Sequence, residues 1–218
     1  MDKQSGQLED AWRILEHHWK IQPRSGGISY TPGYSILRFI FSPIIRGIAR
    51  IKATGSEHIP GRGATILAAN HLSHVDPILV IASSRRKVHY LAKDAHFKNF
   101  FLRLFMNSTG QIETHREEGG DDALASAADV LAANSALGIF PEGTRTKINE
   151  NGRINTGVFA IHKILKIPIL VIKHNAGRYW QNKKFVKKPG TIQIQIFPLI
   201  KKINKKEIFV EKIKGLFY

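Results

Sequence analysis

The stretch ATILAANHLSHVDPILV, residues 64–80, runs from an apolar segment through a polar turn into a second apolar segment. Its first part, ATILAA, has the continuous apolar character of a buried strand, and we expect this strand to end at Asn70. Pro77 is favoured in the first turn of a helix, so Asp76 is a candidate N-cap for the helix that follows. A strand that leads directly into a helix is the repeating unit of α/β folds.

The same alternation continues along the chain. Further strands are predicted for the segments KVHYLA, GQIET, ALGIF, IPILVI and TIQIQIF. Helices are predicted over residues 77–85, 96–106, 122–133 and 157–166. TIQIQIF alternates strictly between apolar and polar residues, so we expect a strand with one solvent-facing side at an edge of the sheet. The pattern predicts an α/β single-domain sandwich over residues 51–200, with a largely parallel or mixed central sheet flanked by helices.

Residues 1–50 contain two helical patterns with apolar faces. The first is a stripe at helical spacing formed by Leu8, Trp12, Leu15 and Trp19. The second covers residues 34–50 and has on one arc of the helix Arg38, Arg46 and Arg50. A membrane-spanning helix needs about 20 apolar residues, which these arginines interrupt. We therefore predict N-terminal helices that lie in a membrane interface, with packing against the domain as the alternative.

The composition narrows the classes of partner and site. The formal net charge is +16, which favours an anionic partner such as nucleic acid, an anionic membrane or an acidic carrier protein. The chain has no helix-turn-helix pattern, zinc finger or aromatic RNA-binding block, so we expect no nucleic-acid binding. There is no cysteine, which excludes disulfides, thiolate zinc sites and thiol nucleophiles. The first residues lack the apolar core of a signal peptide, so we expect an intracellular protein. At the other end, we predict a basic C-terminal helix over residues 201–218.

Two histidines and an aspartate follow the first strand within six residues, at His71, His74 and Asp76. In a continuous helix, residues five apart point about 140° apart, but a turn lets Asp76 reach the His71 ring. A carboxylate bonded to one ring nitrogen fixes the tautomer and makes the other nitrogen a better base. No further cluster completes a metal site, and the chain has no G-x-S-x-G serine elbow. A substrate hydroxyl is therefore the expected proton donor to this pair.

A second informative stretch is LGIFPEGTRTKI, residues 137–148. It predicts a buried strand, a tight turn and then Arg145, whose planar guanidinium suits phosphate. The alternative is a turn in which Glu142 and Arg145 pair with each other. Lys93 and Arg116 follow two other predicted strands. Cations at several strand ends, next to a strand-end histidine, predict a phosphate-binding cleft at one rim of the sheet.

Together these stretches resemble the glycerolipid acyltransferases of the lysophosphatidic acid acyltransferase (1-acyl-sn-glycerol-3-phosphate acyltransferase) type. NHLSHVD, residues 70–76, matches the H-x4-D signature of that family, and FPEGTRT, residues 140–146, matches its F-P-E-G-T-R block. TGQIETHRE lies between them, where the family carries a second block ending in arginine. KIPILVIKHNAGRYW falls where a fourth block is expected, and the resemblance covers about residues 51–200.

The resemblance implies transfer of a fatty acyl chain, from acyl-CoA or acyl carrier protein, to the sn-2 hydroxyl of lysophosphatidic acid, giving phosphatidic acid. Another lysophospholipid, glycerol 3-phosphate or a lyso-aminolipid remains an alternative acceptor. His71 would be the general base and Asp76 would orient it. The implied substrate-binding residues are Lys93, Arg116, Glu142, Gly143, Thr144 and Arg145.

The resemblance also implies that the family's chemistry needs no metal and no cofactor beyond the acyl donor. It places the enzyme as a peripheral or monotopic protein at the cytoplasmic face of the cell inner membrane, docked through its N-terminal helices on anionic lipids.

Overall fold

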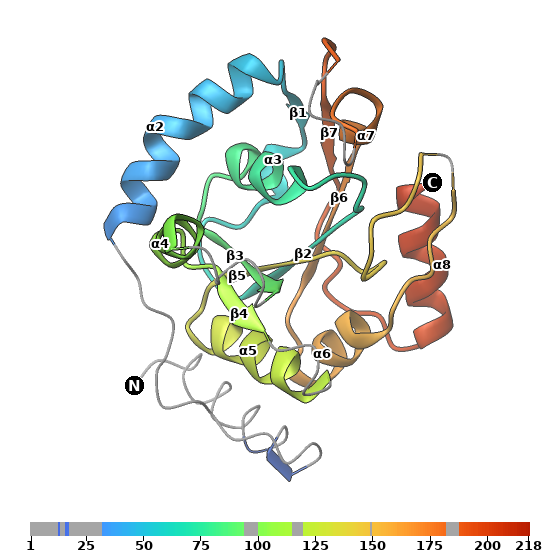
Figure 1. The fold of residues 1–218 in the computed structure, drawn as a ribbon. Helices are drawn as coiled ribbons and strands as arrows, with labels where there is room; N and C mark the ends of the chain where they lie inside the picture. The colour runs from blue at the N-terminus through green and yellow to red at the C-terminus, as the bar shows by residue number, and fades with distance from the viewer. Residues whose placement is uncertain are drawn as a thin grey trace.

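A computed structural model describes residues 13, 16–17, 32–93, 100–114, 120–148, 150–181 and 188–218. The apolar stripe of the first predicted helix (Leu8, Trp12, Leu15 and Trp19) lies outside the described residues. The core is a seven-stranded sheet of order β1-β7-β6-β2-β5-β3-β4 (Figure 1). Its strands are β1 Lys52–Thr54, β2 Thr65–Ala69, β3 Val88–Lys93, β4 Ile112–Thr114, β5 Ala136–Ile139, β6 Ile169–His174 and β7 Gln193–Ile196.

The sheet is mixed, as predicted. Strands β4, β3, β5, β2 and β6 are parallel to one another, whereas β7 is antiparallel to β6 and parallel to β1. β2 lies between β5 and β6, and all of its residues are buried. Because these three strands are parallel, their carboxyl ends meet at one edge of the sheet, which is where ligands bind in open α/β sheets.

The prediction of an edge position for TIQIQIF is wrong. β7 lies between β6 and the short strand β1, although its residues alternate between exposed and buried as expected for a strand with one wet side. β1 has only three residues, KAT, with an exposed, half-buried, exposed pattern. Such a short segment shows no apolar alternation from which a strand could be predicted.

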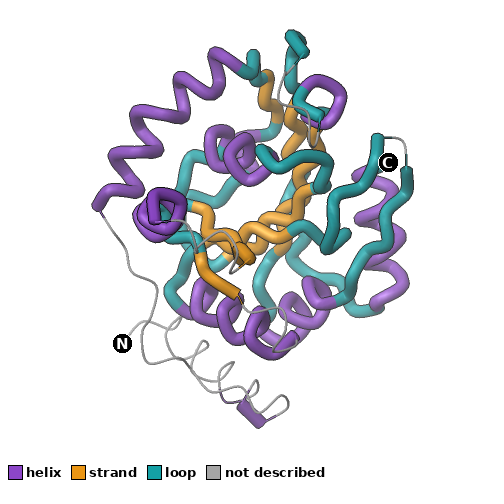
Figure 2. The backbone as a smooth tube through the Cα atoms, in the orientation of Figure 1, coloured by secondary structure: helices purple, strands orange, loops and turns teal. Residues whose placement is uncertain are grey.

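The helices alternate with the strands, and Figure 2 shows them enclosing the sheet. The helical elements are α2 Pro32–Ile48, η1 Ser56–His58, α3 Asp76–Ser83, α4 Phe100–Ser108, α5 Gly120–Ala132, α6 Gly157–Leu165, α7 Ala176–Tyr179 and α8 Lys206–Phe217. Of these, α2 to α6 and α8 correspond to predicted helices with shifted ends. The short helices η1 and α7 were not predicted.

The alternating side chains of β2 divide the core between the two faces of the sheet. Ile66 and Ala68 pack with the apolar residues of α5, α6 and α8. Leu67 and Ala69 pack with α3, α7 and the end of α2 on the other face. The result is a three-layer α/β sandwich, in which helices cover both faces of the sheet (Figure 1).

Helix α2 has two different faces. On its inner face, the hydroxyl of Tyr34 donates to the carbonyl of Val88 at 2.8 Å, and burial raises the pKa of this tyrosine to about 12. Arg38, which the sequence pattern groups with the exposed Arg46 and Arg50, turns inward and donates to the carbonyl of Ser84 at 3.1 Å. The inner face of α2 therefore packs against the domain.

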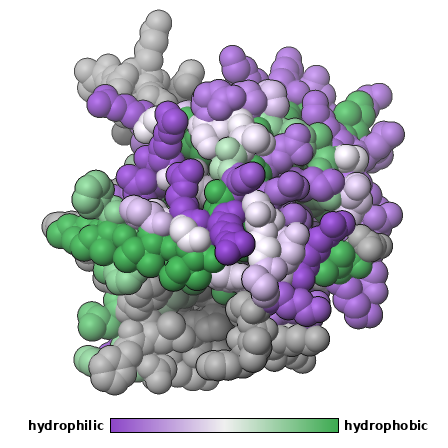
Figure 3. All heavy atoms as spheres, turned by 90° about the horizontal axis from the view of Figure 1, so that it is seen from above, coloured by the Kyte–Doolittle hydropathy of each residue, from purple (hydrophilic) through white to green (hydrophobic). Residues whose placement is uncertain are grey.

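The outer face of α2 is apolar and exposed. It carries Ile36, Phe39, Ile40, Phe41, Ile44 and Ile48, of which Phe39 is 82% exposed. Figure 3 shows hydrophobic atoms gathered on the side of the molecule where α2 lies. Within the described part of the chain, none of the helices combines the length and apolar character needed to cross a bilayer.

Candidate active site

Three neighbouring strands deliver the polar residues of the site. His71 follows β2 and Glu142 follows β5, while His174 is the last residue of β6. β2 is held to β6 at this edge by Asn70, whose side-chain amide donates to the carbonyl of His174 at 3.0 Å and accepts from its N–H at 2.8 Å. This pair of bonds fixes the place where the chain leaves β2, immediately before His71.

The predicted His71–Asp76 pair is formed. Nδ1 of His71 lies 3.0 Å from Oδ2 of Asp76, which is fully buried, whereas the histidine side chain is 18% exposed. The same carboxylate oxygen accepts the backbone N–H groups of Leu72 at 2.6 Å and Ser73 at 2.7 Å. Since a carboxylate accepts hydrogen bonds, Nδ1 carries the ring hydrogen and Nε2 has the lone pair that a base needs.

Asp76 is not the N-cap of α3. The helix begins at Asp76 itself, the preceding Val75 occupies the cap position, and no side chain caps the helix. The carboxylate instead points back into the turn and accepts the N–H groups described above. The N-cap prediction is wrong because the carboxylate accepts from N–H groups of the turn before the helix and makes no cap bond to the helix.

Residues of the FPEGTRT stretch contact both the ring and the backbone of His71. The ring of Phe140 stacks on the His71 ring, with centroids 4.0 Å apart and planes 14° apart. Tyr90 stacks on the far side of Phe140 at 5.2 Å. The N–H of His71 donates to Oε2 of Glu142 at 3.0 Å, and its carbonyl accepts from the N–H of Thr146 at 2.8 Å. The two stretches noted in the sequence therefore form one site.

Glu142 is buried, and its carboxylate accepts hydrogen bonds from the His71 N–H and the Tyr218 hydroxyl. Burial is the main cause that raises its pKa from 4.5 to about 7; bonds from the Tyr218 hydroxyl and the His71 N–H oppose the shift, and the charge of Asp76 adds to it. The alternative in which Glu142 pairs with Arg145 is wrong. Arg145 is exposed and its guanidinium contacts the ring of His74 instead.

Gly143 closes the turn that carries Glu142. Its φ is +70°, and its N–H donates to the carbonyl of Phe140 at 2.9 Å. A Cβ at this position would lie 2.6 Å from Nδ2 of Asn155. The turn therefore requires glycine for both its backbone conformation and its packing.

The predicted phosphate-binding cations are only partly described. β3 ends at Lys93, which is paired with Thr114 of β4, so the backbone of Lys93 lies at the same edge of the sheet as His71. Its side chain is not among those the structure describes, and Arg116 lies outside the described residues. Thr144 and Arg145 are exposed on the turn after β5.

His174 is a site residue that the sequence reasoning missed. Its Nε2 lies 3.8 Å from Oδ1 of Asp76, and both side chains are fully buried. Nδ1 accepts from the N–H of Ala176 at 3.4 Å, so the ring hydrogen is on Nε2 and faces the carboxylate. Burial lowers the pKa of His174, which keeps the ring neutral. Its position at the end of β6 is the same strand-end signal that identified His71.

The ligand trio considered from the sequence is not assembled around a common point. Asp76 is turned toward His71 and His174, whereas His74 contacts Arg145. Among the residues that the structure describes, no group of three or more His, Cys, Asp or Glu side chains is arranged to hold a metal ion.

Three relatives found by comparison with known proteins have the same name. A 1-acyl-sn-glycerol-3-phosphate acyltransferase of Pseudomonas aeruginosa is 42% identical over 79 residues, covering 36% of this chain and 28% of the relative. Enzymes with the same name from Borreliella burgdorferi and Bacillus subtilis are 25% and 27% identical, covering 77% and 55% of this chain. These two alignments span 68% and 60% of the relatives, so the chain matches less than two thirds of the length of two of the three.

A solved structure has the same fold. The lysophosphatidic acid acyltransferase PlsC from Thermotoga maritima superimposes with a TM-score of 0.65 over 97% of this chain and 93% of that one, at 14% identity. The sequence model of the Acyltransferase family matches residues 50–175, which include both motifs and the three strand ends that build the site. The chain belongs to the acyltransferase family.

Proposed function

We propose that this protein transfers a fatty acyl chain from a thioester, on coenzyme A or acyl carrier protein, to the sn-2 hydroxyl of lysophosphatidic acid, forming phosphatidic acid. The observation that carries the proposal is the bond between Nδ1 of His71 and the buried carboxylate of Asp76, inside a clamp made by the FPEGTRT stretch. The names of the three relatives support the choice of acceptor.

In the proposed reaction, Nε2 of His71 takes the proton of the acceptor hydroxyl as the oxygen attacks the thioester carbonyl. The new ester C–O bond forms, the C–S bond breaks, and the departing sulfur receives the proton from the imidazolium. Asp76 stabilises the imidazolium and fixes the tautomer. The stack on Phe140 and the bonds to the His71 peptide hold the ring in place, so little reorganisation is needed during the reaction. We propose no metal and no cofactor beyond the acyl donor.

The acceptor phosphate would be bound at the turn after β5 and at the neighbouring strand ends. The proposed ligands are Lys93, Arg116, Thr144 and Arg145. Arginine presents a planar fork of donors that matches phosphate oxygens. In this proposal the buried Glu142 and the tight Gly143 turn shape the site rather than bind the phosphate, which agrees with the bonds that Glu142 already makes.

The proposed place of reaction is the surface of an anionic membrane, with the protein bound peripherally or monotopically at the cytoplasmic face of the inner membrane. The exposed apolar face of α2 supports this, since a contiguous exposed apolar surface favours a lipid interface (Figure 3). The net charge of +16 adds attraction to anionic headgroups, and we propose no nucleic-acid partner.

A direct test uses the purified protein, labelled acyl-CoA or acyl carrier protein, and a panel of acceptors: lysophosphatidic acid, glycerol 3-phosphate, another lysophospholipid and a lyso-aminolipid. We expect phosphatidic acid as the main product. Arg145→Ala should lower kcat/KM roughly 10–100-fold for acceptors with a phosphate monoester, because it removes a charge-assisted contact. Arg153→Ala, which changes an exposed arginine farther along the same loop, is the matched control.

Preferential turnover of a different acceptor would reject lysophosphatidic acid as the substrate. An equal loss with every acceptor in Arg145→Ala would reject the phosphate-binding role of this arginine.

A further inference from the structure

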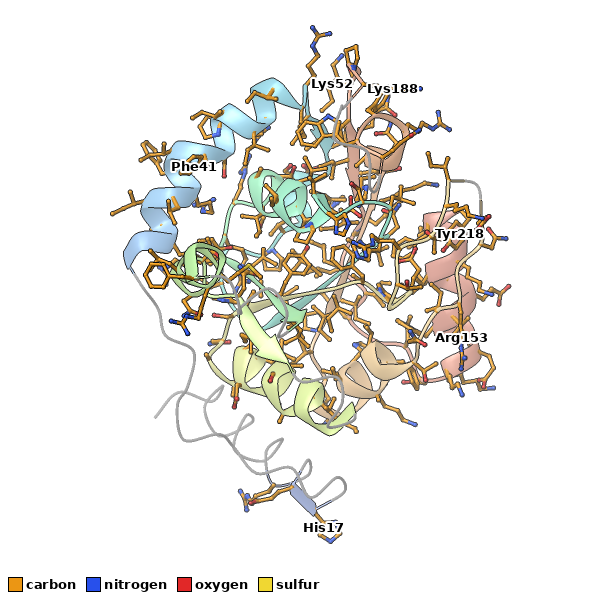
Figure 4. All side chains as sticks on the ribbon, in the orientation of Figure 1. His17, Phe41, Lys52, Arg153, Lys188 and Tyr218 are labelled. Atoms are coloured by element: carbon orange, nitrogen blue, oxygen red, sulfur yellow. The ribbon has the colours of Figure 1, made fainter. Side chains whose placement is uncertain are left out.

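Helix α8 lies outside the segment matched by the family, yet it reaches the active site. Phe209, Ile213 and Phe217 recur every four residues and are buried against the sheet face covered by α5 and α6. This stripe fixes both the position and the rotation of the helix. Tyr218 follows the last turn and lies beside the loop after β5 (Figure 4).

The hydroxyl of Tyr218 has a defined direction. Its oxygen accepts the backbone N–H of Gly152 at 2.7 Å and lies 3.1 Å from Oε1 of Glu142. Because the N–H is a donor, the single hydrogen of the hydroxyl is left for the carboxylate. A Cβ at residue 152 would lie 2.7 Å from the Tyr218 oxygen and 2.9 Å from Cγ of Glu142, so this contact is closely packed.

The two oxygens of Glu142 connect Tyr218 to the proposed base. Oε1 accepts from the Tyr218 hydroxyl, and Oε2 accepts from the backbone N–H of His71 at 3.0 Å. A shift in the orientation of the carboxylate would therefore move the peptide from which the His71 ring projects. The carboxylate is buried, so lost bonds are not replaced easily by water.

We propose that Tyr218 is a positioning residue: its hydroxyl keeps the carboxylate of Glu142 oriented, so that Glu142 holds the backbone of His71 in its reactive position. The inference rests on the proposed acyl transfer for its effect on rate, but the contact itself can be measured without turnover.

The contact between the Tyr218 hydroxyl and Glu142 affects the pKa of Glu142. The groups that act on the Glu142 side chain within the described residues are Asp76 at the start of α3, the His71 N–H after β2, the Tyr218 hydroxyl after α8 and the backbone of Glu142 itself. Burial and the charge of Asp76 raise the pKa of Glu142, and the hydrogen bonds from Tyr218, His71 and its own backbone lower it. Removal of the Tyr218 hydroxyl should therefore raise the pKa further, so that Glu142 becomes protonated at a higher pH.

Tyr218→Phe tests the proposal, since it deletes the hydroxyl and keeps the ring. In the full chain, the backbone amide resonance of His71 should follow the titration of Glu142 during an NMR pH series. We expect the midpoint of the variant to lie about one pH unit above that of the wild type, because a hydrogen bond to a charged group is worth about one pKa unit. The acidic limb of kcat/KM for acyl transfer should move in the same direction, with severalfold loss at pH 6 and little loss at pH 8.5.

Two further variants make the outcomes distinct. Lys212→Ala, an exposed change on the same helix, should leave the midpoint and the pH profile unchanged. In a Glu142→Gln background, Tyr218→Phe should no longer alter the pH profile. A Tyr218→Phe midpoint that coincides with that of the wild type, or an equal loss of activity at every pH, would overturn the proposal. A shifted midpoint in a protein that acylates no lysolipid would support the contact and reject only the proposed acyl transfer.

Discussion

At the active site, His71 is held through its ring and its peptide by different parts of the chain. Asp76 bonds to the ring nitrogen from within the same turn, while Phe140, Glu142 and Thr146 contact the ring or the peptide from the stretch after β5. These contacts agree with the proposed role of His71 as the base, because they restrain the rotation of its ring before a substrate binds.

His71→Ala should lower kcat for acyl transfer by roughly 10²–10⁴-fold, the usual effect of removing a positioned general base. Thermal unfolding and vesicle binding of the purified variant should stay close to those of the wild type, because the ring is partly exposed and lies outside the main apolar clusters. Initial rates with saturating acyl donor measure the effect. A variant with kcat within tenfold of the wild type would contradict the assignment of the base.

The raised pKa of Glu142 predicts a pH dependence of stability. Between the usual value of 4.5 and the folded value of about 7, the native state holds a proton that the unfolded state has released. The contribution of this group to the free energy of unfolding is therefore largest below about pH 4.5 and is lost as the pH rises through 7.

Urea unfolding at pH 5 and pH 8 measures this contribution, which is on the order of 2–3 kcal/mol. Glu142→Gln removes the titration, so the variant should lose less stability than the wild type between the two pH values. Equal losses in the two proteins would contradict the raised pKa.

Several residues of the site could be predicted from sequence, and others could not. The spacing of His71 and Asp76 indicated a turn that brings them together, and the stretch LGIFPEGTRTKI indicated the tight turn after β5. His174 lies at a strand end, as His71 does, but the sequence does not show that it faces Asp76. Tyr218 gave no signal, because its contact with Glu142 joins segments that are far apart in the chain. The inward turn of Arg38 depends on a carbonyl at Ser84 that only the packed helix reaches.

At the scale of elements, the strands of the parallel core were predictable because they are continuous apolar runs. The position of β7 was not, since its alternation describes the two sides of the strand and not its neighbours. β1 is paired with β7, with Lys52 opposite Gln193, and contributes few buried side chains. Sequence periodicity reports burial, whereas strand order depends on pairing between distant segments.

Helix α2 gives a prediction that compares two similar isoleucines. Ile40 on the outer face of α2 is 49% exposed, and Ile208 on α8, on the other side of the molecule in Figure 1, is 52% exposed. If α2 contacts lipid, Ile40→Asp should weaken binding to anionic vesicles roughly tenfold or more, since the burial of about half an isoleucine side chain is lost and a charge is introduced. Ile208→Asp makes the same chemical change and should have a small effect. Vesicle sedimentation measures both, and equal losses would show that α2 has no special role.

For the whole molecule, the charge balance predicts how salt affects membrane binding. The chain carries 33 Lys and Arg against 17 Asp and Glu. Attraction between these charges and anionic headgroups falls as the Debye length shortens from about 10 Å at 0.1 M salt to about 3 Å at 1 M. Affinity for anionic vesicles should therefore drop steeply over this range, whereas the smaller affinity for neutral vesicles, which depends on apolar burial, should change little. Identical salt curves for both vesicles would argue against an electrostatic contribution.

The strand order also determines at what point during synthesis the site around His71 can form. The site around His71 is built from β2 and its two neighbours β5 and β6, and the hydroxyl that contacts Glu142 comes from Tyr218, after α8. During synthesis, each of these segments must leave the ribosome before the contacts around His71 are complete. A partly translated chain that carries both signature motifs would therefore still lack part of the proposed site.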